Sequence, residues 1–249
     1  MRRYTTLTFD VGWTLAHPEP PFWEVFSSIC GQLGSPFSPE EARQAIEEPW
    51  VKLARRPFLE DRPYHDSDEK FRESIWTISE GVFRRAGLAA AQMQAGFEQF
   101  YQIFYDSRCW RLYPEVPEVL ERLRAAGYAL VIISNAHTYM TQICQELDLT
   151  PRFDHVIISA CEGIRKPDRR IFEKALSLTG ARPEQALHVG DFYLEDVCGP
   201  LHLGMQSIRI DRQAKAFLPA MHQILFADDG SPLPHPVIYS LQDLVAYLE

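Results

Sequence analysis

Residues 5–15 read TTLTFDVGWTL, a short apolar run that breaks off at Asp10 and enters a turn containing Gly12. Leu7 and Phe9 lie among β-branched threonines, a composition typical of a buried strand. A strand that ends in an acid at a glycine turn can present a carboxylate at the edge of an open α/β sheet. Asp10 is therefore the first candidate for chemistry, although Asp and Gly are also ordinary turn residues.

The composition is that of an ordinary globular protein. The chain has 249 residues, of which 46% are hydrophobic and 24% charged, enough for one large domain or a core with an inserted smaller one. A net charge of -9 argues against a nucleic-acid partner, which needs a basic surface. Five cysteines without a CxxC pair indicate neither a disulfide framework nor a zinc site. No apolar segment has the length of a signal core or a membrane span, so we expect a cytoplasmic protein without a membrane partner. Its oligomeric state is not indicated.

The block that follows the first strand has a helical pattern. Prolines at 18, 20 and 21 forbid regular helix and predict a linker. From residue 22 to about 106 the apolar residues recur three and four apart, and no comparable strand run is present. The clearest predicted helix begins at Ser67 and ends near Gly87. Its apolar stripe from Phe71 to Phe83 is interpreted as packing rather than ligand binding.

Residues 55–65, RRPFLEDRPYH, mix three arginines with two prolines and two aromatic residues, which predicts a loop between helices. Arg55 and Arg56 are candidates to bind an anionic substrate. A solvated cluster of surface charges is the ordinary alternative for such a stretch.

Strands and helices alternate after residue 114. The predicted elements are helix 116–126, strand 128–133, helix 138–147, strand 155–159, helix 168–178, strand 186–189, helix 194–203, strand 205–210, strand 237–239 and helix 241–248. Repeated strand-helix units imply right-handed crossovers and a parallel sheet covered on both faces. The sequence therefore predicts an α/β, Rossmann-like core with an all-α block inserted into it.

Polar side chains stand where these predicted strands end or where a helix follows. They are Asp10, Ser134, Asn135, Lys166, Asp191 and Asp196. Each has an ordinary alternative, such as a capping hydroxyl or an acid favoured in the first turn of a helix. Together they supply a carboxylate nucleophile, a hydroxyl donor, a fixed positive charge and acids for a hard cation. These are the components needed for attack on a phosphoryl group.

Four motifs resemble, in order, those of the haloacid dehalogenase-like (HAD) hydrolase superfamily: FDVGWTL, VIISN, GIRKPDRRIF and HVGDFYLEDVCGPLHLGM. The similarity covers residues 1–16 and about 109–249, which the resemblance identifies as a HAD-like α/β core domain. The all-α block, residues 17–108, lies where the superfamily inserts a helical cap domain.

The resemblance implies a role for each matching residue. Asp10 would attack phosphorus to form an aspartyl-phosphate, while Ser134 and Lys166 would stabilise the phosphoryl oxygens. Asn135 would belong to the same substrate-binding set.

The resemblance also implies a magnesium site. Mg²⁺ would be held by the side chains of Asp10 and Asp191 and by the backbone carbonyl of Gly12. Asp196 would support the metal site or Lys166 from outside the set of direct ligands.

One position departs from the family pattern. Phosphatases of this superfamily usually carry a second Asp two residues after the nucleophile as general acid and base, and here that position is Gly12. General acid-base catalysis is typically worth about 10²- to 10⁴-fold in rate. Either the leaving group is stable as an anion, as in an acyl phosphate, or another group such as His17 acts as the acid.

The sequence thus predicts a Mg²⁺-dependent phosphohydrolase acting on a small phosphorylated metabolite. Two alternatives stay open. One is a metal-independent haloacid dehalogenase-type hydrolase, against which the GD at Asp191 argues. The other is a catalytically weak binding or regulatory protein that uses the same fold.

Overall fold

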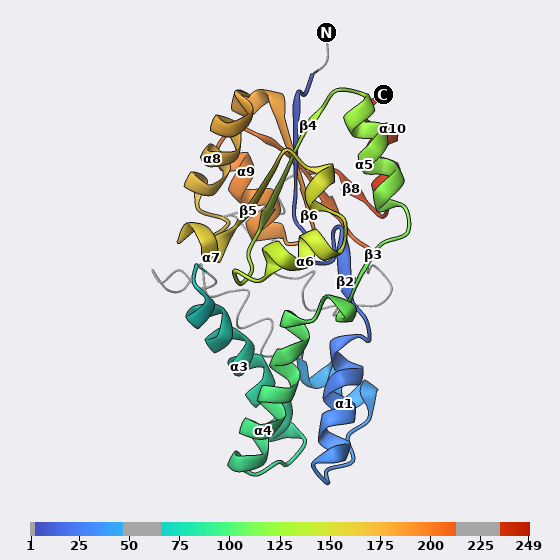
Figure 1. The fold of residues 1–249 in the computed structure, drawn as a ribbon, viewed down its shortest axis with the longest axis vertical. Helices are drawn as coiled ribbons and strands as arrows, with labels where there is room; N and C mark the ends of the chain where they lie inside the picture. The colour runs from blue at the N-terminus through green and yellow to red at the C-terminus, as the bar shows by residue number, and fades with distance from the viewer. Residues whose placement is uncertain (1–2, 47–65, 213–234) are drawn as a thin grey trace.

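The computed structural model describes residues 3–46, 66–212 and 235–249. Within these ranges six strands form one parallel sheet, in the order β5-β4-β1-β6-β7-β8 (Figure 1). The strands are β1 (Thr6–Phe9), β4 (Ala129–Ser134), β5 (His155–Ile158), β6 (Ala186–Gly190), β7 (Gln206–Ile210) and β8 (Val237–Ile238). The predicted parallel α/β core is confirmed.

Strand β1 lies inside the sheet and is buried along its whole length. Phe9 pairs in register with Ile132 of β4 on one side and with Val189 of β6 on the other. The backbone N–H of Asp10 donates to the carbonyl of Val189 at 3.0 Å, so the ladder holds the residue that directly follows the strand. Two flanking strands therefore fix the position of Asp10.

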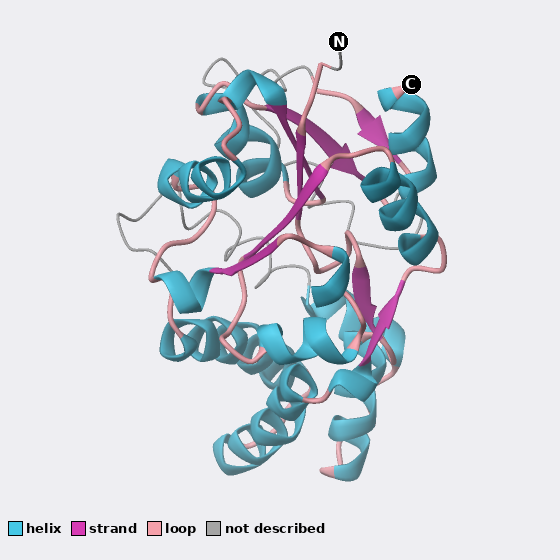
Figure 2. Ribbon diagram, turned by 45° about the horizontal axis from the view of Figure 1, so that its top comes forward, coloured by secondary structure: helices cyan, strands magenta, loops and turns pink. Residues whose placement is uncertain are grey.

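Helices cover both faces of this sheet, as Figure 2 also shows. They are α5 (Val116–Ala125), α6 (Met140–Glu146), α7 (Ser159–Glu162), α8 (Arg169–Thr179), α9 (Gly199–His202) and α10 (Leu241–Leu248). Helices α8 and α9 lie on one side and α5 and α10 on the other. Helix α5 buries Val116, Val119, Leu120 and Leu123, the spacing of an amphipathic helix facing a core.

The predicted helix 194–203 is irregular in the structure. Residues Tyr193–Cys198 form a π-helical segment, and α9 continues from it. Pro200 has no N–H to donate to the carbonyl of Asp196, four residues earlier. That carbonyl instead accepts a hydrogen bond from the hydroxyl of Ser207 at 2.5 Å. The proline and this outside partner together account for the helical hydrogen bond that is missing at Asp196.

A helical block, defined here as α1 (Phe22–Gln32), α3 (Asp68–Arg85) and α4 (Ala90–Tyr101), lies beyond the carboxyl edge of the sheet (Figure 1). Residues 39–46 are also helical, and short 3₁₀ turns, η1 (Gln102–Tyr105) and η2 (Ser107–Cys109), follow α4. Ser67 caps α3 by accepting a hydrogen bond from the backbone N–H of Lys70 at 3.3 Å, as the sequence predicts.

The two connections between the helical block and the sheet lie side by side. Strand β2 (Ala16–Pro18) pairs antiparallel with β3 (Trp110–Leu112), with Ala16 opposite Leu112. The sequence predicts only a linker at residues 16–21 and no strand at 110–112. Each of these strands has three residues, too few for a readable alternation of apolar and polar positions.

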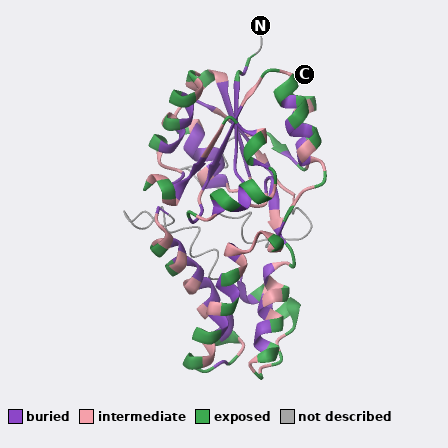
Figure 3. Cartoon of the chain, in the orientation of Figure 1, coloured by how far each residue is buried: buried purple, intermediate pink, exposed green. Residues whose placement is uncertain are grey.

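Aromatic residues fill the helical block. Phe26 stacks on Phe100 with ring centroids 4.0 Å apart and meets Phe83 edge-on at 5.4 Å. Figure 3 shows the buried inner faces of these helices and the buried sheet. Such ring pairs contribute about 0.5–1.5 kcal/mol each beyond the area they bury.

His137 joins the block to the sheet. It follows β4, is fully buried, and packs its ring 4.9 Å from Phe71 of α3 and 4.8 Å from Tyr105 of η1. Neither ring nitrogen has a hydrogen-bond partner among the residues that the structure describes. Burial lowers the pKa of His137 to about 4, against a small opposing effect of Asp68.

We predict that His137 makes the fold sensitive to mild acid. Its pKa is lower in the folded than in the unfolded chain, so stability is full above pH ~6.5 and falls as the unfolded state takes up the proton. Between pH 7 and pH 5 this one group lowers the free energy of unfolding by up to about 2 kcal/mol.

Chemical denaturation of wild type and His137→Phe at both pH values measures that contribution. The pH-dependent loss should be smaller in His137→Phe by about this amount. His202→Phe, at an exposed position, serves as the control. Identical pH dependence in wild type and His137→Phe would contradict the assignment.

Candidate active site

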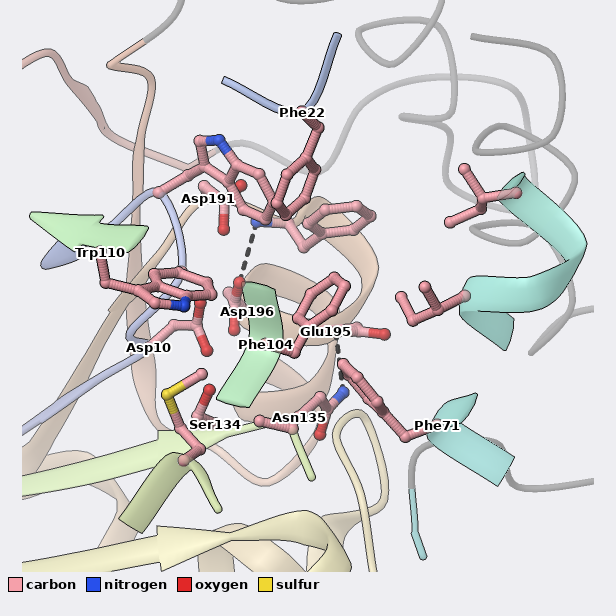
Figure 4. Close-up of a pocket in the computed structure, with 17 residues that line it drawn as sticks. Asp10, Phe22, Phe71, Phe104, Trp110, Ser134, Asn135, Asp191, Glu195 and Asp196 are labelled. Carbon is pink, nitrogen blue, oxygen red and sulfur yellow. Dashed lines mark hydrogen bonds between the residues drawn. The ribbon is translucent and has the colours of Figure 1, made fainter. Parts of the chain in front are cut away.

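A pocket lies between the carboxyl edge of the sheet and the helical block (Figure 4). Its polar lining comes from the ends of β1, β4 and β6 and from the π-helical segment. These residues are Asp10, Gly12, Ser134, Asn135, Asp191, Glu195 and Asp196. The pocket therefore collects the side chains that the sequence places at strand ends.

The ammonium group of Lys166 is buried against two carboxylates. Its Nζ donates to Asp10 Oδ1 at 2.8 Å and to Asp196 Oδ1 at 2.5 Å. Burial alone would lower the pKa of Lys166, but the charges of Asp10 and Asp196 outweigh it and raise that pKa above its ordinary value. Lys166 is thus a fixed positive charge beside Asp10.

Asp196 is held from three sides. Besides Lys166, its Oδ1 accepts from Nε2 of His188 at 2.9 Å, and its Oδ2 accepts from the backbone N–H of Phe192 at 2.8 Å. Burial alone would raise its pKa, but Lys166 and His188 bring the pKa down to about 2. Because an ionised carboxylate only accepts, Nε2 of His188 carries the proton, and Nδ1 accepts from the hydroxyl of Thr8 at 2.7 Å.

Asn135 fixes the loop that carries Lys166. Its side chain accepts from the backbone N–H of Lys166 at 2.8 Å and donates to the carbonyl of the same residue at 3.0 Å. It also donates to Glu195 at 2.8 Å, and Glu195 forms an ion pair with Arg165. Sequence reasoning missed Glu195 and Arg165. Glu195 directly precedes Asp196 and Arg165 directly precedes Lys166, and these positions could have identified both as residues near the site.

Three carboxylates, Asp10, Asp191 and Asp196, form what we name the carboxylate cluster. Each offers an oxygen, and these oxygens lie within 4.8 Å of one another. Burial raises the pKa of Asp10 to about 6 despite Lys166, and burial with the charges of Asp10 and Asp196 holds the pKa of Asp191 well above its ordinary range. Such a crowded acidic set suits a hard divalent cation.

The three carboxylates differ in how many of their oxygens already accept hydrogen bonds from the protein. Both oxygens of Asp196 accept hydrogen bonds from protein groups. Asp191 keeps part of its surface open, and Asp10 shares one oxygen with Lys166. The donor set therefore fits a cation held chiefly by Asp10 and Asp191.

The candidate positions around Asp10 do not all lie at the pocket. Gly12 lines it, whereas His17 lies in β2 with its ring 4.7 Å from Tyr113 and is not a lining residue. The structure gives no support to His17 as the missing acid. Arg55 and Arg56 lie outside the described residues.

The family model of the haloacid dehalogenase-like hydrolases matches residues 4–197 of this chain. The chain belongs to this family of hydrolases, as the four motifs indicate.

Individual relatives carry different names. Human haloacid dehalogenase-like hydrolase domain-containing protein 3 is 31% identical over 207 residues, which are 82% of this chain and 80% of the relative. Glyceraldehyde 3-phosphate phosphatase of Pyrococcus furiosus is 31% identical over 134 residues, 47% of this chain and 56% of the relative. A solved structure of 2-haloacid dehalogenase from Pseudomonas syringae pv. Tomato has a TM-score of 0.59, 24% identity and 98% coverage of both chains. The fold alone therefore does not distinguish a phosphatase from a dehalogenase.

Gly190 makes room for the carboxylate of Asp196. A Cβ built on Gly190 would lie 2.3 Å from Cγ of Asp196, whereas a Cβ on Gly12 meets nothing within 4 Å. We predict that Gly190→Ala lowers the free energy of unfolding by about 1–3 kcal/mol, because the displaced carboxylate loses its hydrogen bonds.

The matched variant Gly12→Ala, at the same edge of the sheet, should change stability by less than about 0.5 kcal/mol. Denaturant unfolding of both variants measures the difference. Equal stabilities would show that Asp196 is not confined as the structure indicates.

Proposed function

We propose that the protein is a Mg²⁺-dependent phosphohydrolase that acts on a small phosphorylated substrate through an aspartyl-phosphate. The observation that carries this proposal is the carboxylate cluster beside the ammonium of Lys166. It places a nucleophilic oxygen, a cation-binding set and a fixed positive charge at one point. Relatives named as phosphatases support the same chemistry.

Asp10 and Asp191 would hold the metal, with the backbone carbonyl of Gly12 beside them. A bound Mg²⁺ would neutralise charge on the phosphoryl oxygens and orient the phosphate. It would also offset the negative charge of Asp10, which together with burial and Asp196 holds the pKa of Asp191 above its ordinary range.

In the first step an oxygen of Asp10 attacks phosphorus, and the bond between phosphorus and the leaving oxygen breaks. Lys166 and the hydroxyl of Ser134 stabilise the phosphoryl oxygens while the leaving group departs with the bonding electron pair. Lys166 also orients the carboxylate of Asp10 through its hydrogen bond to Oδ1. The lysine is itself held in place because Asn135 bonds both its backbone N–H and its carbonyl.

In the second step water attacks phosphorus of the aspartyl-phosphate. The bond to Asp10 breaks, which regenerates the carboxylate and releases inorganic phosphate, while the proton of water passes to solvent. Gly12 has no side chain to assist either proton transfer, so both steps depend mainly on electrostatic stabilisation.

The division of the chain follows from the same proposal. Residues 1–16 and 109–249 are the core domain that carries the chemistry, and residues 17–108 are a cap domain over the pocket. The apposed β2 and β3 are where the chain passes between them.

A metal-independent dehalogenase is the second candidate. Without a cation, Asp191 would place a second carboxylate next to Asp10 and repel the carboxylate of a haloacid. Chelation with EDTA separates the two candidates, because it should stop phosphate release and spare dehalogenation.

The first test is Asp10→Asn, assayed for phosphate release from a panel of phosphorylated metabolites with Mg²⁺. An amide fits the same space but is a poor nucleophile, so the rate should fall by about 10³-fold or more. Asp148→Asn, on the surface, is the matched control. Release at the wild-type rate from Asp10→Asn would place the nucleophile elsewhere.

A second test compares Asp191→Asn with Asp196→Asn by calorimetric titration of Mg²⁺. The first substitution should weaken Mg²⁺ binding by more than about 10²-fold. The second removes a supporting residue and should cost less, about 10-fold. Asp196→Asn should also lower the free energy of unfolding, because Lys166 and His188 lose a charged partner. Equal losses of Mg²⁺ affinity would overturn the ranking.

A further inference from the structure

We propose that the preferred substrates are phosphate monoesters of phenols, in which the leaving group is flat, apolar and weakly basic. The inference rests on the proposed phosphohydrolase function and names its substrate class. Two independent features support it: the apolar side of the pocket and the missing side chain at position 12.

A large part of the pocket lining is apolar. We name it the apolar wall: Phe22, Phe71, Ile75, Ile78, Phe104 and Trp110. Figure 4 shows the labelled aromatic rings close to the labelled acids, with Trp110 beside Asp10 and Phe22 near Asp191. These six side chains are 3–5% exposed, so the surface that they present to the pocket is shielded from bulk water.

The wall offers few polar partners to a bound group. The indole N–H of Trp110 already donates to the carbonyl of Ile103 at 3.3 Å. The amide of Asn135 is used by Lys166 and Glu195. A polyhydroxylated leaving group would lose its hydration without replacement, which is costly.

The charges of the lining residues also disfavour a leaving group that carries a second anionic group. Among the described residues that line the pocket, the charged ones are Asp10, Asp191, Glu195 and Asp196, all of them acids. Lys166 is engaged with two of these acids on the phosphate side. A carboxylate or second phosphate on the leaving group would therefore find no cationic side chain among these lining residues, whereas an aromatic ring packs edge-on or offset against the wall.

Gly12 restricts the leaving group by its reactivity. Without a general acid at that position, the leaving oxygen departs as an anion. Phenols ionise near pH 10, as tyrosine does, whereas aliphatic alcohols resemble water, with a pKa of about 15.7. A phenol therefore departs without the acid that an alcohol needs, and its ring matches the wall.

Three substrates separate the two features. Phenyl phosphate has both properties, 2-phenylethyl phosphate keeps the ring but has an alcohol as leaving group, and glycerol 3-phosphate has neither. The measurement is kcat/KM for phosphate release with Mg²⁺, which reports the step in which the leaving group departs. We expect phenyl phosphate to exceed 2-phenylethyl phosphate by about 10²-fold or more, and 2-phenylethyl phosphate to exceed glycerol 3-phosphate by about 10-fold.

Variants test each feature alone. Gly12→Asp adds an acid where a Cβ meets nothing within 4 Å. It should reduce the ratio of kcat/KM between phenyl phosphate and 2-phenylethyl phosphate, and leave the ratio between 2-phenylethyl phosphate and glycerol 3-phosphate unchanged. Ile78→Lys replaces apolar surface of the wall with a charged group, and should lower the ratio of 2-phenylethyl phosphate to glycerol 3-phosphate towards 1. Thr77→Lys adds the same charge one residue away, at a position that does not line the pocket, and should leave both ratios unchanged.

Glu195 is the other lining acid that could protonate a leaving group, so Glu195→Gln completes the set. If Glu195 is only structural, both alkyl and aryl substrates slow equally. A selective loss with 2-phenylethyl phosphate would identify it as the acid and overturn the argument from Gly12.

The outcomes distinguish this inference from the proposed function. If none of the three substrates nor the metabolite panel releases phosphate, the proposed function fails, and this inference with it. If phosphate is released but glycerol 3-phosphate or an anionic metabolite is preferred, the proposed function stands and the aryl specificity is wrong. In that case Arg55 and Arg56 would become the residues to substitute next.

Discussion

The ion pairs of Lys166 with Asp10 and Asp196 join three segments that lie far apart in the sequence: the end of β1, the loop before α8 and the π-helical segment. Burying an ammonium group and two carboxylates costs several kcal/mol for each ion unless they neutralise one another at short distance. Without the lysine, the carboxylate cluster would be three acids crowded into a buried space. The other polar contacts of the site, from Asn135 to His188, keep this arrangement in place.

The polar half of the site was predictable from the sequence because it depends on strand order. In a parallel sheet every strand ends at the same edge, so Asp10, Ser134 and Asp191 are brought together by topology alone. Lys166 was predicted from its motif. The direct contact of its Nζ with both Asp10 and Asp196 needed the structure.

Two other features depend on contacts with residues far away in the sequence, which a local sequence pattern does not indicate. At the end of the π-helical segment, Pro200 cannot donate to the carbonyl of Asp196, and the distant Ser207 donates to it instead. The sequence predicts that the apolar stripe of α3, from Phe71 to Phe83, serves only for packing. Its second half, Val82 and Phe83, is buried and does not line the pocket. Its first half, Phe71, Ile75 and Ile78, both packs and lines the pocket, because those turns of α3 lie over the edge of the sheet.

The apolar wall draws on the places where the chain passes between sheet and helical block. Phe22 begins the first helix after β2, and Trp110 begins β3; both line the pocket. These residues therefore belong to the junction between the sheet and the helical block as well as to the pocket lining. A substitution there changes the pocket lining and the junction between the sheet and the helical block at the same time. Ile75 and Ile78 line the pocket from α3 and do not belong to that junction. A change of selectivity therefore disturbs that junction least when it is made on this face of α3.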